Sequence, residues 1–300
     1  MSSPEKTVLI TGATGKQGGA VVAHLLASPG ASSFNIVAVT RDSTTDRARR
    51  LAELPGVSVV EGDFSDVSAV FARTGPVWGV FSVQVNSDNE ERQGKAMVDA
   101  AVAHGVQHFV YSSGDRGGPA RSDFDATNVK NFAAKYGIEK HLIAQATLSP
   151  QKMTYTILRP VTFFENLTAD VHGKGFARMW EQLGDKKLQF VSTADIGWFA
   201  AASFLSPAEH AGAAVTVVGD ELTQPEADAV FRQVTGRPMP IAPCVVANTV
   251  KLVLRDSVGD MFRWFGESGY GGSVEACRET YPPIQDFRAW IEANKGRWAK

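Results

Sequence analysis

The chain has 300 residues, of which 44% are hydrophobic and 21% charged, and its formal net charge is −2. Such a chain can bury a large core, and its near-zero charge argues against the basic surface that nucleic-acid-binding proteins use. Only two cysteines occur, Cys244 and Cys277, far apart and outside any CxxC or histidine pattern. We therefore expect no disulfide framework and no metal site.

The N-terminus lacks a basic segment followed by an apolar core, and no window holds the roughly 18 apolar residues that cross a bilayer. We expect a soluble protein that does not bind membranes. The cysteine usage favours the cytosol, with the nucleus as a second location. The sequence does not indicate an oligomeric state.

The first predicted elements are a strand, a tight turn and the start of a helix. The apolar run 7–10 leads into Gly12, Gly15 and Gly18, and an apolar helical face follows. In this pattern the glycines permit the turn, the approach of backbone to a pyrophosphate, and the packing of helix on strand. A dinucleotide is therefore the predicted ligand, and the loop residues expected to bind it are Gly12, Thr14, Gly15, Lys16, Gln17 and Gly18.

The next predicted strand, 35–40, ends immediately before Arg41. NAD sites place an acidic residue here for the ribose 2′-hydroxyl, whereas a nearby arginine accommodates the 2′-phosphate of NADP. The planar guanidinium of Arg41 suits a phosphate, and Lys16 offers a second cation. We therefore favour NADP(H). In the alternative interpretation Asp42 takes the acidic role and Arg41 is a solvated surface charge.

Helices and strands then alternate along the chain. The predicted strands cover 57–61, 77–83, 108–113 and 154–158, and the predicted helices cover 46–54, 66–71, 89–104 and 129–147. This alternation predicts an α/β protein with a doubly wound parallel sheet, the Rossmann architecture.

The alternation becomes looser from residue 159. Later strands are predicted at 187–191 and 215–218, and shorter helices at 224–234 and 284–293. We expect a nucleotide-binding domain over 1–158. The segment 159–300 is expected to supply the remaining strands, interleaved with a smaller lobe for a substrate or partner.

Ligands of doubly wound sheets bind at the carboxyl ends of the strands. Phe81 and Gln84 lie at the end of the strand 77–83, where they could wall a nicotinamide. Phe163, Phe164 and Asn166 follow the strand 154–158 and are expected on the substrate side, although aromatic residues at such positions often belong to the core.

Several motifs together resemble the NmrA-like family of atypical short-chain dehydrogenase/reductases, and in particular its fungal members. They are Thr11–Gly19, Arg41, Gly62-Asp63, Val110–Ser113, Leu158–Pro160, Phe164–Leu167, Ser192–Gly197, Gly219–Thr223 and Tyr281–Phe287. The resemblance implies an NADP(H)-binding Rossmann fold. It implies either of two functions, because some members are reductases and others are redox-sensing regulators.

Ordinary short-chain dehydrogenases use Tyr-x-x-x-Lys on one helix, and this chain has Asn131 where that tyrosine would stand and Lys135 in place of the lysine. An amide does not titrate usefully, so the standard proton transfer is absent. The resemblance to the reductase branch implies that Lys135 acts near the substrate. It would either hold the nicotinamide ribose or donate a proton, and the alternative is an exposed helical lysine.

The resemblance also implies roles for three further residues. Ser112 and Ser113 fall where the family has its catalytic serine, although either could simply cap the strand. Asp63 is similar to the residue that meets the adenine edge, and it could equally be a helix N-cap.

The favoured function is an NADPH-dependent reductase of a small carbonyl or conjugated metabolite. The alternative is a non-catalytic NADP(H) sensor that regulates a protein partner such as a transcription factor, and Asn131 is its main support. A redox-neutral isomerase or cyclase on the same fold is a third reading.

Overall fold

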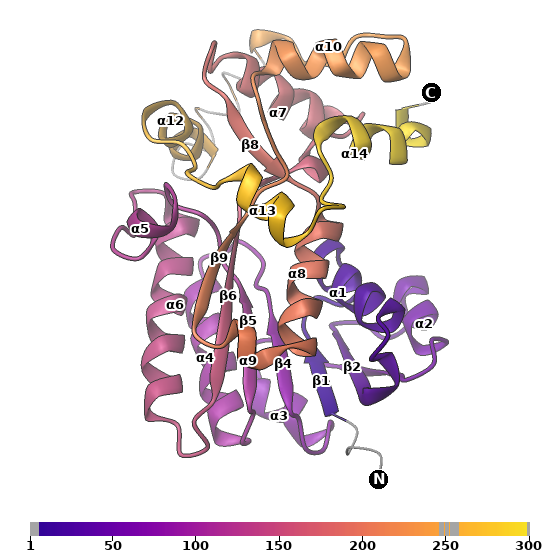
Figure 1. Cartoon of the computed structure of the whole chain (residues 1–300), viewed down its shortest axis with the longest axis vertical. Helices are drawn as coiled ribbons and strands as arrows, with labels where there is room; N and C mark the ends of the chain where they lie inside the picture. The colour runs from indigo at the N-terminus through magenta and orange to yellow at the C-terminus, as the bar shows by residue number, and fades with distance from the viewer. Residues whose placement is uncertain (1–5, 246–248, 250–251, 253–257, 299–300) are drawn as a thin grey trace. The chain divides into compact units, whose positions relative to one another are not determined.

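The computed structural model describes residues 6–245, 249, 252 and 258–298 (Figure 1). Its main sheet has the strand order β3-β2-β1-β4-β5-β6-β9. These strands are β1 (Lys6–Ile10), β2 (Phe34–Thr40), β3 (Val57–Glu61), β4 (Gly79–Ser82), β5 (His108–Ser112), β6 (Thr154–Pro160) and β9 (Ala213–Val217). All neighbouring pairs from β3 to β6 are parallel. The order reverses between β1 and β4, so the predicted doubly wound sheet is confirmed.

The chain forms two compact units that interleave along the sequence. The first comprises 1–113, 134–159 and 196–215, and the second comprises 114–133, 160–195 and 216–300. The chain thus leaves the first unit after Ser113, returns to it for 134–159, and leaves it again until the segment 196–215. The returning segment contains most of α8 (Thr193–Leu205) and of β9.

Within the first unit, helices cover both faces of the sheet (Figure 1). Leu9 and Phe109 of the sheet belong to one apolar cluster with Ile138, which joins α3 (Val67–Ala72), α4 (Glu90–Ala103) and α6 (Lys130–Leu148) on one face. Side chains alternate between the faces of a strand, so Gly79 faces the other way. A Cβ on Gly79 would lie 3.0 Å from the ring of Phe204 in α8. The helix α8 therefore covers the opposite face.

The second unit is built on a three-stranded sheet of order β10-β8-β7 and an aromatic core. Its strands are β7 (Thr162–Phe163), β8 (Leu188–Val191) and β10 (Asp220–Leu222), and its main helices are α7 (Val171–Glu181), α10 (Gln224–Thr235), α12 (Asp260–Glu267) and α14 (Phe287–Ala293). Phe164 and Phe190 stack within this core with ring centroids 5.5 Å apart. Other helices with described bounds are α1 (Lys16–Ala27), α2 (Asp46–Ala52), α5 (Pro119–Ser122), α9 (Pro207–His210) and α13 (Val274–Thr280), with short 3₁₀ turns at Ala31–Ser33, Phe164–Asn166 and Lys295–Trp298.

Candidate functional site

The glycine loop between β1 and α1 has the backbone geometry that its sequence predicts. Gly12 has a φ of +60°, a conformation that side chains other than glycine rarely adopt. Its carbonyl accepts a hydrogen bond from the Gly15 N–H at 2.8 Å, which closes the turn. A Cβ on Gly18 would lie 2.4 Å from the same Gly12 carbonyl oxygen. Only a glycine at position 18 lets α1 approach the loop this closely.

The start of α1 is exposed beside this loop. Gly15 is its N-cap and makes no side-chain capping hydrogen bond. Gly15 and Lys16 are exposed, while Thr14 and Gln17 are half-buried. An exposed helix N-terminus favours an anion, so the loop fits the pyrophosphate of a dinucleotide.

The ends of β2 and β3 carry the residues predicted to meet the adenosine half of the ligand. Arg41 is exposed. Hydrogen bonds from Ser65 lower the pKa of Asp63, and the positive charge of Arg41 contributes to the same effect. Arg41 and Asp63 therefore lie within electrostatic reach of each other. Because Asp63 accepts from the Ser65 N–H at 2.6 Å, its carboxylate also shapes its own turn.

Asp42, the alternative acidic residue, is engaged locally. Its carboxylate accepts from the Thr44 N–H at 2.8 Å and from the Thr44 hydroxyl at 2.6 Å. These hydrogen bonds lower the pKa of Asp42. The carboxylate thus stabilises the turn before α2.

The sequence analysis did not identify Arg47, which also lies beside the glycine loop. Its guanidinium donates to the Thr14 carbonyl at 3.4 Å. Thr45 caps α2 by accepting from the Ala48 N–H, and this cap places Arg47 in the first turn of the helix. The sequence shows that Thr45 can cap a helix, but it does not show that this helix brings Arg47 to the glycine loop.

The residues at the end of β4 point into the protein. Phe81 is fully buried, so its ring has no surface to offer a nicotinamide, and the predicted role of Phe81 as a wall is corrected to one in the core. Gln84 is also buried, and its amide nitrogen donates to the Ser82 hydroxyl at 2.7 Å. The side-chain carbonyl of Gln84 makes no hydrogen bond within the described part of the chain.

Both candidate serines at the end of β5 are buried and hold neighbouring elements. The Ser112 hydroxyl donates to the Gln17 side-chain oxygen at 2.6 Å, which links β5 to the first turn of α1. The Ser113 hydroxyl donates to Glu139 of α6. Glu139 is in turn paired with Arg159 at 2.7 Å, and both of these side chains are buried.

Lys135 lies on α6, and its ammonium forms an ion pair with Glu90 of α4. The side chains of Lys135 and Glu90 are 13% and 1% exposed. Lys135 is therefore not the exposed helical lysine of the alternative interpretation. Asn131, one turn earlier on α6, is half-buried.

The three residues after β6 that were predicted to line the substrate differ in their burial within the second unit. Phe164 is fully buried, and its ring lies 5.4 Å from that of Trp290. The prediction that Phe164 lines a substrate is therefore corrected, because the ring belongs to the aromatic core. Phe163 is half-buried and Asn166 is exposed, so both retain surface for a ligand.

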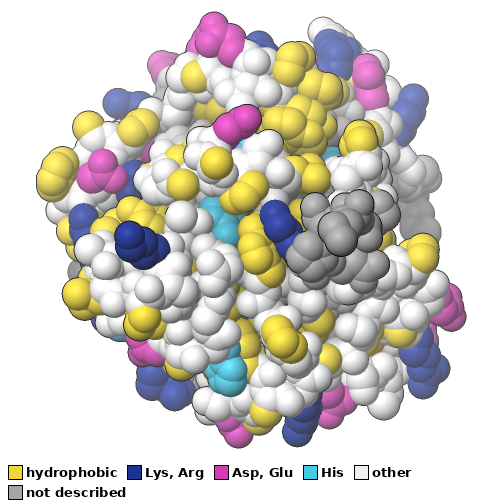
Figure 2. Space-filling model, turned by 60° about the horizontal axis from the view of Figure 1, so that its bottom comes forward, with side chains coloured by type: hydrophobic (Ala, Val, Ile, Leu, Met, Phe, Trp, Pro, Cys, Tyr) yellow, Lys and Arg dark blue, Asp and Glu magenta, His cyan; other side chains and the backbone are white. Residues whose placement is uncertain are grey.

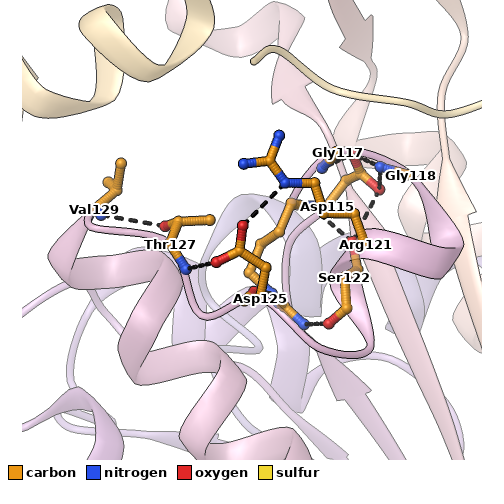
Figure 3. A network of polar contacts seen from close by, with 9 residues as sticks. Asp115, Gly117, Gly118, Arg121, Ser122, Asp125, Thr127 and Val129 are labelled. Atoms are coloured by element: carbon orange, nitrogen blue, oxygen red, sulfur yellow. Dashed lines mark hydrogen bonds and ion pairs between the residues drawn. The ribbon is translucent and has the colours of Figure 1, made fainter. Parts of the chain in front are cut away.

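The loop after β5 is organised around Asp115, which the sequence analysis passed over (Figure 3). This carboxylate is fully buried and accepts from the N–H groups of Gly117, Gly118 and Gly271 at 3.0–3.2 Å. The neighbouring Arg116 is equally buried and donates to the Ser122 carbonyl at 2.6 Å. The network fixes the loop from within the second unit.

Asp195 is another buried carboxylate of this unit. Burial raises the pKa of Asp195 to about 6, and the negative charge of Glu165 acts in the same direction. Hydrogen bonds from the Ser192 hydroxyl at 2.7 Å and the Gln285 N–H at 3.2 Å oppose this rise.

Within the described residues, no three His, Cys, Asp or Glu side chains converge as metal ligands would. No described helix combines the length and apolarity that a membrane crossing requires. On the face drawn in Figure 2, basic and acidic side chains are interspersed.

The sequence is similar to those of several fungal proteins. The NmrA-like family domain-containing oxidoreductase FrzB of Cladobotryum is 29% identical over 261 residues, covering 77% of this chain and 74% of that protein. The related oxidoreductase lnaB of Aspergillus flavus is 41% identical over 125 residues, which span only 36% of its length.

A solved structure shares the fold. The NADPH-dependent quinone oxidoreductase QOR2 of Escherichia coli, complexed with NADPH, has a TM-score of 0.75 at 22% identity and covers 96% of this chain and 99% of its own. At this identity the likeness shows the architecture alone. The model of the NmrA-like family matches residues 4–288, nearly the entire sequence. The chain therefore belongs to the NmrA-like family.

Proposed function

We propose that the protein is an NADPH-dependent oxidoreductase that reduces a small carbonyl or conjugated metabolite. The glycine loop fits a dinucleotide, because Gly18 has no room for a side chain and the N-terminus of α1, which favours an anion, is exposed. Arg41 and Arg47 supply two guanidinium groups for a 2′-phosphate. Bound NADPH would supply a hydride to the substrate, and solvent would supply the proton.

The observation that carries the proposal is the ion pair between Lys135 and the buried Glu90. A charged pair in the interior costs desolvation free energy, so a purely structural role would be better served by apolar side chains. A cation held in place can stabilise negative charge that develops on a carbonyl oxygen. The names of the fungal relatives and of the NADPH-bound quinone oxidoreductase agree with this reading.

The test is NADPH oxidation by the purified protein over a panel of quinones, enones, ketones and imines. We expect Lys135→Ala to lower kcat/KM at least 100-fold on a working substrate. Lys95→Ala is the matched control, because Lys95 pairs with Glu91 on the exposed side of α4, and it should retain activity. Unchanged turnover in Lys135→Ala would contradict the assigned role.

The absence of the usual tyrosine supports a second candidate, an NADP(H) sensor with a protein partner. Asn131 cannot act as a general acid. A sensor requires unequal affinities for NADPH and NADP⁺, because a ligand shifts an equilibrium only through differential affinity. Tight NADPH binding without turnover on the panel, together with nucleotide-dependent proteolysis, would favour this function over the reductase.

A further inference from the structure

The helices α4 and α6 approach each other at two glycines. A Cβ on Gly94 of α4 would lie 2.3 Å from the terminal methyl group of Ile138. A Cβ on Gly137 of α6 would lie 2.4 Å from a carboxylate oxygen of Glu91. Glycine is a poorer helix former than alanine. The two glycines therefore lower the intrinsic stability of each helix but allow α4 and α6 to pack closely at this crossing.

This crossing brings Glu90 against Lys135. Glu90 lies in the first turn of α4 and is almost fully enclosed, whereas Lys135 keeps some exposed surface. The second carboxylate oxygen of Glu90 is buried and makes no hydrogen bond within the described part of the chain. Glu90 is thus too enclosed to touch a ligand, and it can act on one only through its ion pair with Lys135.

The neighbouring charged groups are already paired with other partners. Glu91 of α4 pairs with Lys95 at 2.6 Å on the same helix. Glu139 of α6 pairs with Arg159 and accepts from Ser113. Glu90 therefore supplies the counter-charge to Lys135.

We propose that Glu90 is a positioning residue that keeps the ammonium of Lys135 charged and fixed. The inference rests on the proposed function and deepens it, because it makes Lys135 a permanent cation for bound nucleotide or substrate. The carboxylate lies in the interior, where an opposite charge favours the ionised form of its partner more strongly than it does in water. Lys135 accordingly acts by electrostatic stabilisation, and it does not give up its proton in each turnover.

The charge on Lys135 can be followed directly in the full-length protein. Lysine labelled with ¹³C at Cε reports protonation by NMR, and the Lys135 signal is identified by its loss in Lys135→Arg. In Glu90→Gln, which keeps the shape but loses the charge, we expect this signal to titrate at least about one pH unit lower than in the wild type. Glu91→Gln is the matched control and should leave it unchanged.

A conservative variant and a binding measurement complete the experiment. Glu90→Asp retains the carboxylate and should restore part of the wild-type titration. In Glu90→Gln the dissociation constant for NADPH should begin to rise about one pH unit lower than in the wild type, because Lys135 loses its charge earlier, while Glu91→Gln follows the wild type. A thermal unfolding scan establishes that each variant is folded.

A wild-type titration of Lys135 in folded Glu90→Gln would overturn the positioning role, and so would a Glu90→Asp variant indistinguishable from Glu90→Gln. The NMR titration needs neither nucleotide nor turnover. If the wild-type protein fails to oxidise NADPH, the proposed function is contradicted while the Lys135 signal still decides the role of Glu90.

Discussion

Two arginines beside the glycine loop use their guanidinium groups differently. Arg41 is exposed and within electrostatic reach of Asp63, whereas Arg47 already donates to the Thr14 carbonyl. Arg41 therefore has more freedom to bind a 2′-phosphate bidentately.

We predict that Arg41→Ala weakens NADPH binding about 10- to 100-fold and leaves NADH binding nearly unchanged, because a charged hydrogen bond contributes about 1.5–3 kcal/mol. Arg47→Ala should weaken NADPH less. Fluorescence titrations at one fixed salt concentration measure both, with the exposed Arg50→Ala as control. Equal losses for the two nucleotides in Arg41→Ala would show that Arg41 does not read the phosphate.

The sequence could predict Arg41 but not Arg47. The end of an apolar strand marks position 41, whereas the approach of Arg47 depends on a turn shaped by Asp42 and Thr44. Phe81 and Phe164 show a related limit. Their strand-end positions are evident in the sequence, but whether a ring faces ligand or core depends on tertiary packing.

At the scale of single elements, two helices contain glycines with opposite surroundings. In α1 an added Cβ at Gly18 meets the loop backbone, whereas in α7 a Cβ at Gly175 would meet nothing within 4 Å. The same substitution should therefore have opposite effects on the free energy of unfolding.

We predict that Gly18→Ala destabilises the protein by about 1–3 kcal/mol and weakens NADPH binding, because the loop backbone must shift. Gly175→Ala should stabilise it by about 0.5–1 kcal/mol by lowering the entropy of the unfolded chain. Denaturant unfolding of both variants measures the difference. A Gly18→Ala protein as stable as the wild type would mean that α1 can move away from the loop at no cost.

The sequence analysis did not predict the helices α7 and α8. The helix α7 contains two glycines, Gly173 and Gly175, which are poor helix formers. The helix α8 is apolar on most sides because it is largely buried, so it lacks the amphipathic stripe that identifies surface helices. The strands from β1 to β6 were predictable because their apolar runs alternate with helical segments along the chain.

At the scale of the whole molecule, each unit has a buried group that makes the free energy of unfolding depend on pH, and the two dependences have opposite signs. Burial lowers the pKa of His108 in the first unit to about 4, with smaller contributions from His210 and Lys6. Stability from a neutral buried histidine is present above about pH 6.5 and is lost as pH falls toward 4, because the unfolded state binds the proton first. The raised pKa of Asp195 in the second unit has the reverse effect, since the folded state binds its proton first.

We predict opposite pH trends for two variants. Each pKa unit corresponds to about 1.4 kcal/mol, so each group contributes on the order of 3 kcal/mol. The stability deficit of His108→Gln should shrink as pH falls from 6.5 to 4. Relative to the wild type, Asp195→Asn should be most favourable above pH 6 and lose that advantage toward pH 4. Urea unfolding at several pH values measures both, and a pH-independent difference for either variant would contradict the sign assigned to that group.

The interleaving of the two units also sets an order on biosynthesis. Gly79 and His108 pack against Phe204 of α8, and this helix is made long after the strands that it covers. A nascent chain that has emerged only through β6 therefore exposes one apolar face of its sheet. The glycine loop leaves the ribosome long before residue 215, yet the unit that supports it is complete only when that residue follows.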